Sequence, residues 1–337
     1  MIKVETVRLE LKNKWQISRG SLDVKEIVVA RIEKDGVVGL GEASPNTRYG
    51  ETVALTLRRI REAAPIFETH DLFHYQNIKT ALDAAITDQS CAKAALDTAL
   101  MDWIGKSLNA PLYKLWGFNP DDAPLTSYTI GIDTTEMIRQ KTRDAAEFPI
   151  LKIKLGVEND REIMAAVRNE TDKPIRVDAN EGWTTREEAL EKIHWLETQG
   201  VEFVEQPMPA GNLADIAWLR ERVNLPLVAD EDVKTAADIP RLAGVYDGVN
   251  IKLMKSGGLL EGLRMIQVAR ALGLKIMLGC MIESSIAISA AAQLAPMVDW
   301  ADLDSNLLLR NDPFSGVKVV EGRFVFNDKP GIGLLTG

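Results

Sequence analysis

Three carboxylates follow three successive short apolar stretches of the chain. Asp178 ends PIRVD, Glu205 ends VEFVE, and Asp230 follows PLVA. If these stretches are parallel strands of one barrel, their carboxyl ends meet at one mouth, where the acids repel one another unless a cation lies between them. Oxygen ligands without histidine or cysteine suit Mg²⁺. We therefore expect one magnesium ion there. The alternative, in which the acids only cap the following helices, fits one acid better than three.

Two lysines stand two residues apart in the strand-like stretch LKIKLG, so they share one face of it. The apolar residues between and beside them take the other face. Lys152 and Lys154 would then point into a barrel mouth filled with anions, rather than into water from an edge strand. Lys252, in NIKLMK, ends a strand four positions further around an eight-strand ring, and hence on the opposite side. Lys255 is a second candidate, which we expect in a loop.

Amines on both sides of a metal-bound substrate suit one type of reaction. One amine removes a proton from one face of a carbon, and the other returns a proton to the opposite face. A metal on the substrate carboxylate stabilises the enediolate formed in between. Lysine is a weak base at its ordinary pKa of about 10.4, but burial, a metal and a neighbouring cation each lower a lysine pKa. The lysine pair of LKIKLG supplies such a neighbour.

The rest of the composition argues against several other classes of protein. His70, His74 and His194 fall in predicted helices or in the first part of the chain, so neither a zinc site nor a Ser-His-Asp triad is supported. The net charge of −9 disfavours nucleic acid as a partner. No uncharged apolar run is long enough to span a membrane, and the N-terminus lacks the apolar core of a signal peptide. We expect a cytoplasmic protein that binds no membrane.

The first part of the chain must form strands and then helices. Residues 1 to about 41 alternate as strands do, with a polar loop, KNKWQISRGSLD, between the first two. Apolar residues at helical spacing follow from about 51 to 118. This order predicts an α+β domain over residues 1–120.

From about residue 126 the chain repeats a short strand and a helical stretch. The strands follow one another at roughly 22 to 27 residues, as βα units of a parallel sheet require. Eight strands with seven helices between them predict a (β/α)7β barrel over 121–310, in preference to an open doubly wound sheet. Residues 311–337 are expected to return to the first domain. The expected strands are SYTIGI, ILKIKLG, PIRVDAN, VEFVEQP, PLVADED, GVNIKLM, KIMLGC and WADLDS.

The chain resembles the enolase superfamily, in its muconate-lactonizing-enzyme branch. The matching motifs, in the family's order, are GLGEASP, LKIKLG, VDANEGW, VEQP, VADE and NIKLMKSGG. The resemblance implies an α+β cap domain over a (β/α)7β barrel, one Mg²⁺ per active site and a homo-oligomer. The implied metal ligands are Asp178, Glu205 and Asp230. The implied acid/base catalysts are Lys154 and Lys252, and Lys152 would help to hold the substrate carboxylate.

The DLDS stretch of the eighth strand resembles the DxD of dipeptide epimerases, in which two acids hold the free amino group of the substrate. Asp302 and Asp304 match these acids, although they could also only cap the chain's exit from the barrel. Arg19 matches an arginine that meets the substrate's side-chain carboxylate in L-Ala-D/L-Glu epimerases. Asp232 departs from the ADES of many relatives and should add a charge near the mouth. Further pocket residues implied are Thr129, Met281 and Ile282.

The resemblance implies a Mg²⁺-dependent isomerase acting on dipeptides, with L-Ala-L-Glu as the expected substrate and murein peptide recycling as the process it serves. Epimerisation of other dipeptides, such as hydrophobic ones, stays open. Two further reactions of the same branch use the same metal and lysines: o-succinylbenzoate synthesis and N-acylamino acid racemisation. Their substrates offer no cationic group to Asp302 and Asp304. A non-catalytic barrel kept as a binding protein would be expected to lack one of the lysines or acids.

Overall fold

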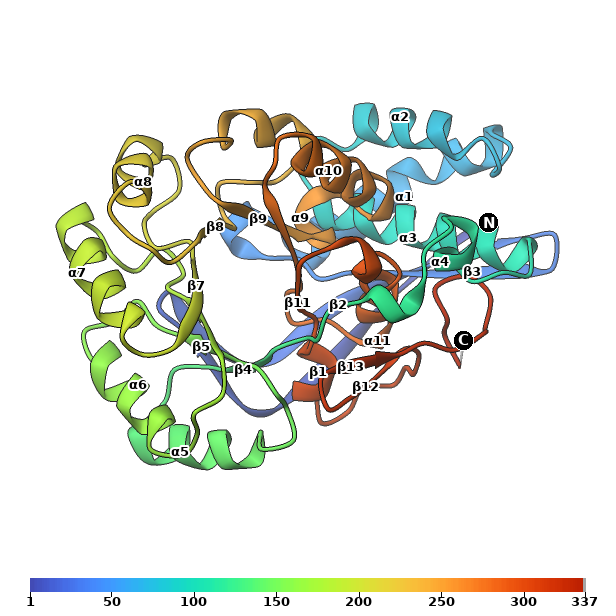
Figure 1. Ribbon diagram of the computed structural model, residues 1–337. Coiled ribbons are helices and arrows are strands. Elements are labelled where there is room, and N and C mark those ends of the chain that lie inside the picture. Colours follow the sequence, from blue (N-terminus) through green and yellow to red (C-terminus); the bar gives the residue numbers. More distant parts are fainter. Residues whose placement is uncertain (336–337) are drawn as a thin grey trace.

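The structure is a computed structural model that describes residues 1–335. Its N-terminal part is an antiparallel sheet in the order β1-β2-β3, followed by helices (Figure 1). The three strands are β1 (Ile2–Ile17), β2 (Gly20–Lys34) and β3 (Val37–Ala43). The helices are α1 (Val53–Thr69), α2 (Tyr75–Ala85), α3 (Ser90–Ser107) and α4 (Leu112–Leu115). These elements form the cap that the strand-then-helix order predicted.

The polar loop predicted between the first two strands is wrong, because most of that segment is strand. β1 runs to Ile17 and β2 begins at Gly20, with an irregular register between Glu10 and Trp15. Trp15 is partly buried and packs against the core although lysines and an asparagine precede it. Tertiary contacts, rather than local polarity, therefore extend the hairpin and place Arg19 at its tip.

The glycines of GLGE let helix α3 lie directly on strand β3. A Cβ atom at Gly39 would stand 2.1 Å from the carbonyl oxygen of Ala99, and one at Gly41 would stand 2.0 Å from that of Ala95. Both distances are far inside van der Waals contact, so no larger residue fits without moving the helix backbone. This close packing fixes the cap sheet relative to α3.

Eight parallel strands form the second part of the molecule, in the order β4 to β11. An isolated bridge between Thr126 and Ala301 joins the two ends of this sheet, and the Ser127 amide donates to the Ala301 carbonyl at 3.1 Å. The predicted barrel is therefore confirmed, and the open sheet is not found. The strands are β4 (Tyr128–Ile130), β5 (Leu151–Lys154), β6 (Ile175–Asp178), β7 (Val201–Glu205), β8 (Leu227–Ala229), β9 (Gly248–Lys252), β10 (Lys275–Gly279) and β11 (Trp300–Asp302).

Helical segments connect successive barrel strands. The connection between β8 and β9 is a 3₁₀ helix, Ala236–Arg241, that contains Pro240; proline has no amide hydrogen to donate to an α-helix. The other connections are α-helical. They are α5 (Thr135–Asp144), α6 (Asp160–Arg168), α7 (Arg186–Glu197), α8 (Leu213–Arg220), α9 (Leu253–Ser256), α10 (Leu259–Ala271) and α11 (Ser285–Ala292).

The C-terminal segment returns to the cap, as predicted. It contains a small antiparallel pair, β12 (Lys318–Val320) and β13 (Arg323–Val325). Further on, the Leu112 amide at α4 donates to the Gly331 carbonyl at 2.9 Å, and the Ile332 amide donates to the Asp102 carboxylate at 2.9 Å. The turn between β12 and β13 instead contacts the barrel, where the Thr126 amide donates to the Gly322 carbonyl at 2.8 Å, so the segment contacts both parts of the molecule.

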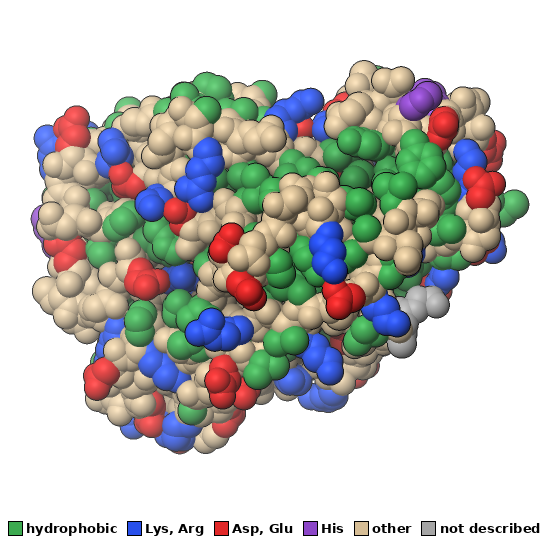
Figure 2. All heavy atoms as spheres, turned by 45° about the vertical axis from the view of Figure 1, so that its right-hand side comes forward, with side chains coloured by type: hydrophobic (Ala, Val, Ile, Leu, Met, Phe, Trp, Pro, Cys, Tyr) green, Lys and Arg blue, Asp and Glu red, His purple; other side chains and the backbone are tan. Residues whose placement is uncertain are grey.

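The surface in Figure 2 carries basic and acidic side chains next to one another, with apolar side chains between them. No wide area of that face bears one sign of charge. Within residues 1–335, no helix combines the length and the apolar character needed to cross a membrane.

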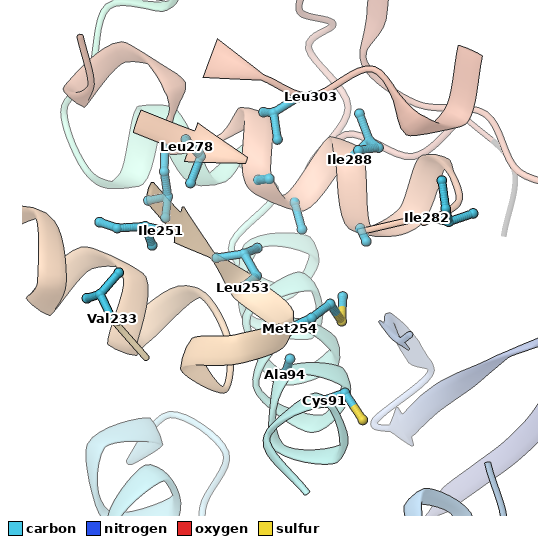
Figure 3. Close-up of a cluster of buried hydrophobic side chains, with 14 of the residues drawn as sticks. Cys91, Ala94, Val233, Ile251, Leu253, Met254, Leu278, Ile282, Ile288 and Leu303 are labelled. Atoms are coloured by element: carbon cyan, nitrogen blue, oxygen red, sulfur yellow. The ribbon is translucent and has the colours of Figure 1, made fainter. Parts of the chain in front are cut away.

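A continuous apolar core joins the cap to the barrel. Figure 3 shows Leu253 and Met254 of α9 beside Ala94 and Cys91 of α3. All four side chains are buried. Because these contacts cross from one part of the molecule to the other, the cap has a defined position over the carboxyl ends of the barrel strands.

Candidate active site

The three acids predicted to bind a metal lie together at the carboxyl ends of neighbouring strands. Asp178 ends β6, Glu205 ends β7, and Asp230 follows β8. One carboxylate oxygen from each lies within 4.8 Å of the other two, and all three residues are buried. Three hard oxygen donors at one buried point suit a divalent cation such as Mg²⁺.

Ammonium groups neutralise these acids in the structure. Lys154 Nζ lies 2.6 Å from Asp178 Oδ2, and Lys252 Nζ lies 2.8 Å from Asp230 Oδ2. Burial raises the pKa of Asp178, but Lys154 and Lys152 outweigh it and bring that pKa to about 2. The pKa of Glu205 is raised, by burial and by the charge of Asp178.

The oxygen atoms of Glu205 give a direct test of the fit to a metal. Oε1 accepts a hydrogen bond from Asn250 Nδ2 at 2.6 Å. Oε2 is buried and has no hydrogen bond, although Lys152 Nζ lies 2.6 Å away without hydrogen-bond geometry. The Lys152 ammonium offsets part of this charge, and three carboxylates this close together favour a further cation between them. The residues present therefore fit a cation at this point.

Lys152 lies beneath the site and does not line the cavity above it. Its side chain is 1% exposed, and Nζ lies 2.7 Å from Asp302 Oδ2. Burial lowers the pKa of Lys152, but Asp302 and Glu205 outweigh it and hold that pKa well above its ordinary value. Its ammonium contacts the acids at the floor of the cavity, and its part in holding a substrate carboxylate stays a prediction.

Lys154 and Lys252 both line the cavity, from strands β5 and β9 that stand on opposite sides of the barrel. Lys255 does not line it. The prediction that Lys255 lies in a loop is wrong, since it lies in the one-turn helix α9, where it is buried and donates hydrogen bonds to the side chain and carbonyl of Asp230. Burial lowers the pKa of Lys255, whereas Asp230 and Glu205 outweigh burial at Lys252 and raise its pKa.

A cavity of about 460 Å³ lies between the cap and the carboxyl ends of the barrel strands. This volume suits a small molecule rather than a macromolecule. The cap contributes both strands of the β1–β2 hairpin and the segment after β3, and the barrel contributes the ends of its strands. Predicted site residues that line it are Arg19, Thr129, Lys154, Asp230, Lys252, Met281, Ile282, Asp302 and Asp304.

The two acids of DLDS lie side by side at this cavity. Asp302 Oδ1 accepts from the Ser127 hydroxyl at 2.7 Å and from the Thr129 hydroxyl at 3.2 Å. Asp304 Oδ2 accepts from the Thr129 amide at 2.6 Å. Burial and the charge of Asp302 raise the pKa of Asp304 to about 7. Ser127 was not predicted as a site residue, although it shares a strand face with Thr129 two residues later.

Arg19 lines the cavity, but its guanidinium is already paired. It lies 2.8 Å from Glu181 and 2.6 Å from Glu231, and it donates to the Asn180 carbonyl at 2.9 Å. Arg48, after β3, also pairs with Glu181, at 2.8 Å. The sequence analysis did not identify these partners, because they lie more than 130 residues away along the chain.

Two other acids near the strand ends have structural partners. Asp232, expected to add charge at the mouth, does not line the cavity. It accepts hydrogen bonds from Gln206 at 2.9 Å and from the Tyr246 hydroxyl at 2.8 Å. Glu283 is buried and accepts from the Met281 amide at 2.7 Å, so it shapes the loop that presents Met281.

Lys25 is a further cavity residue that the sequence analysis did not identify. It lies on β2, and its ammonium donates a hydrogen bond to the carbonyl of Pro45. In the sequence it is one of many lysines among charged neighbours, and nothing local marks it as half-buried. Only the position of the cap over the barrel brings it to the site.

Two protein-family descriptions match separate parts of this chain. Residues 136–335 match the family described as Enolase C-terminal domain-like. Residues 1–117 match the N-terminal domain of the mandelate racemase / muconate lactonizing enzyme family.

Three proteins are similar to this chain over nearly its whole length. It is 45% identical to the L-Ala-D/L-Glu epimerase of Bacteroides thetaiotaomicron, over 97% of this chain and 85% of that protein. It is 41% identical to an L-Ala-D/L-amino acid epimerase of Pedosphaera parvula, over 96% and 94%. The crystal structure of a dipeptide epimerase from Enterococcus faecalis, complexed with Mg and L-Leu-L-Tyr, matches with a TM-score of 0.93 and 32% identity, over 99% and 98%. The chain therefore belongs to the mandelate racemase/muconate lactonizing enzyme family of the enolase superfamily.

Proposed function

We propose that this protein is a Mg²⁺-dependent dipeptide epimerase that inverts the α-carbon next to the C-terminal carboxylate, with L-Ala-L-Glu and L-Ala-D-Glu as its preferred pair. One observation carries the proposal: a single cavity is lined by two lysines from opposite strands, by a ligand of the three-carboxylate site, and by two further acids, one at the end of β11 and one two residues after it. The similarity to three epimerases of dipeptides supports it.

The two lysines supply the proton transfers. A substrate α-carbon held between Lys154 and Lys252 has one amine on each face, so one Nζ can take the α-proton while the other ammonium delivers a proton to the opposite face. Asp178, Glu205 and Asp230 would hold the metal. Bound there, Mg²⁺ supplies positive charge for the substrate carboxylate and for the electron density left by the departing proton.

Asp302, at the end of β11, and Asp304, just after it, select a substrate with a free amino group. Asp302 and Asp304 offer an anionic surface at the cavity, and hydrogen bonds from Thr129 keep both carboxylates in place. An ammonium is the complementary group for such a pair. Substrates of o-succinylbenzoate synthases and N-acylamino acid racemases lack it, so these two activities fit the site less well.

A dipeptide with an acidic second residue is favoured by the basic side chains of the cap at the cavity and by the 45% identity to the L-Ala-D/L-Glu epimerase. The proposal extends to murein peptide recycling, where such a dipeptide arises. We also propose that the protein is a homo-oligomer. Its domains would span residues 1–120, 121–310 and 311–337, as predicted from the strand and helix pattern.

The test is chiral analysis of the products from a panel of L-Ala-L-Xaa dipeptides, with N-succinyl and N-acetyl amino acids as comparison substrates, in Mg²⁺ and in EDTA. We expect L-Ala-L-Glu to yield L-Ala-D-Glu only in Mg²⁺, and faster than the other dipeptides are converted. Conversion of N-acylated amino acids alone would refute the dipeptide proposal.

A further inference from the structure

Lys25 differs from every other basic side chain at the cavity within residues 1–335. Arg19 and Arg48 are paired with Glu181, and Lys154 and Lys252 are paired with acids of the metal site. The Lys25 ammonium has no carboxylate at ion-pair distance among the described residues. Its hydrogen bond to the Pro45 carbonyl uses one of its three donors, so up to two remain for a ligand in the cavity.

Three buried acids surround Lys25 at longer range, but each has its own hydrogen-bond donors. Glu42 accepts from the Ser284 amide at 2.9 Å, Glu51 from the Cys91 amide at 3.0 Å, and Glu283 from the Met281 amide. Burial raises the pKa of Glu42 to about 8 and that of Glu283 to about 7, so their negative charge is incomplete near neutral pH. Burial lowers the pKa of Lys25 and outweighs the opposing effects of Cys91, Glu51, Glu283 and Glu42.

Arg19 is placed to fasten the cap instead. It reaches Glu181, Glu231 and the Asn180 carbonyl, all in loops at the carboxyl ends of barrel strands. The neighbouring Ser18 hydroxyl donates to the same carbonyl at 3.0 Å. These contacts hold the tip of the β1–β2 hairpin against the barrel. A substrate carboxylate would have to compete with two carboxylates already bound to Arg19.

We propose that Lys25, rather than Arg19, receives the anionic side chain of the dipeptide, and that Arg19 is a positioning residue that fastens the hairpin over the cavity. This inference rests on the proposed epimerase function and deepens it. Together with Asp302 and Asp304 for the ammonium, and the metal site for the α-carboxylate, it gives each charged group of a dipeptide with an acidic second residue a complementary partner.

The experiment compares L-Ala-L-Glu with L-Ala-L-Gln, which has nearly the same shape but no side-chain charge. The ratio of their kcat/KM values is measured for the wild type, Lys25→Met and Arg19→Met. A charge-assisted hydrogen bond contributes about 1.5–3 kcal/mol, so we expect Lys25→Met to lower the Glu/Gln ratio by about tenfold or more. Arg19→Met should lower both kcat/KM values by a similar factor and leave the ratio unchanged.

Conservative variants separate a lost charge from a damaged fold. Lys25→Arg should keep most of the Glu/Gln ratio, and Lys25→Gln replaces Lys25→Met if the latter does not fold. An unchanged ratio in the neutral Lys25 variant, or a ratio that collapses only in Arg19→Met, would overturn the inference. A wild type that epimerises both dipeptides equally well would overturn it and leave the epimerase function standing, whereas a wild type that epimerises neither would contradict the function itself.

Discussion

At the scale of single residues, the two lysines at the cavity have different surroundings from the two lysines beneath it. Lys154 and Lys252 line the cavity, whereas Lys152 and Lys255 are buried against the acids. Sequence spacing places Lys152 and Lys154 on one strand face, but it cannot tell which of them ends below the floor. Strand alternation and depth in the barrel are separate quantities, and only the first can be deduced from the sequence.

Replacing either cavity lysine should abolish epimerisation. A positioned acid or base contributes about 10²–10⁴-fold to a rate, so Lys154→Ala and Lys252→Ala should each lose at least about 10²-fold in conversion of L-Ala-L-Glu. Lys275→Gln is the matched control, because Lys275 begins strand β10 at the other end of the barrel and is exposed. Epimerisation rates by chiral chromatography give the answer, and full activity of both alanine variants would contradict the two-lysine assignment.

Removing one acid of the metal site should abolish most of the stabilisation of the folded state by Mg²⁺. A ligand that binds only the folded state stabilises it by about 2.7 kcal/mol at 100 times its Kd. Mg²⁺ should therefore raise the Tm of the wild type, and Glu205→Gln should lose most of that rise. Glu202→Gln, on the same strand but outside the site, should keep it. A magnesium-dependent Tm shift that survives in Glu205→Gln would remove Glu205 from the ligand set.

At the scale of elements, a carboxylate from the cap holds a helix of the barrel. Glu42 lies near the end of β3, and its side chain accepts hydrogen bonds from the Ser284 amide and hydroxyl at the start of α11. The loop before this helix presents Met281 and Ile282 to the cavity. The GLGE motif thus links cap packing, through its glycines, to the shape of the pocket, through its glutamate.

The stability of the protein should fall as pH rises through the range in which Glu42 ionises. Burial, and next the charge of Glu283, raises the pKa of Glu42 from 4.5 to about 8. Between those two values the folded state binds the proton that the unfolded state has lost, so a rise in pH destabilises the folded state. Glu42→Gln should make this decline shallower in thermal unfolding from pH 5 to 9.

The control for that prediction is Glu26→Gln, because Glu26 is exposed on β2. It should leave the pH dependence of the Tm as in the wild type. If Glu42→Gln also showed the wild-type decline, the destabilisation at high pH would have to come from other buried acids, such as Asp97, whose pKa burial raises to about 7.

Elements with a regular repeat were predictable, and the parts set by long-range contacts were not. The eight short strands recur at even spacing, so the barrel and its mouth could be predicted from apolar runs alone. The hairpin around Trp15 could not, because its residues are locally polar and become strand by packing on the barrel. The ion pairs of Arg19 could not either, since Glu181 and Glu231 belong to separate barrel loops.

At the scale of the whole molecule, the cap is held by its sheet, by α3 and by the returning C-terminal segment. Asp102 of α3 joins all three: it accepts from the Leu40 amide at 2.8 Å and from the Ile332 amide at 2.9 Å, and it pairs with Lys106 at 2.7 Å. The acid is fully buried. The cavity exists only while the cap and barrel stay together, so such junctions serve the function indirectly.

Asp102→Ala should loosen the whole cap. It leaves two buried backbone amides without their acceptor, each at a cost of about 1–3 kcal/mol, so the free energy of unfolding should fall by about 2–6 kcal/mol. Urea denaturation measures this loss, with Asp121→Ala, at an exposed position, as the control. A loss below about 1 kcal/mol would mean that the C-terminal segment contributes little to the cap.

The most direct test of the central claim is proton NMR of L-Ala-L-Glu incubated with the protein and Mg²⁺ in D₂O. We expect the α-proton signal of the glutamate residue to disappear and its D-epimer to accumulate with deuterium at the same carbon. The α-proton of the alanine residue should be retained. Epimerisation without deuterium uptake would contradict exchange through two lysines, and no exchange in any dipeptide would contradict the epimerase function.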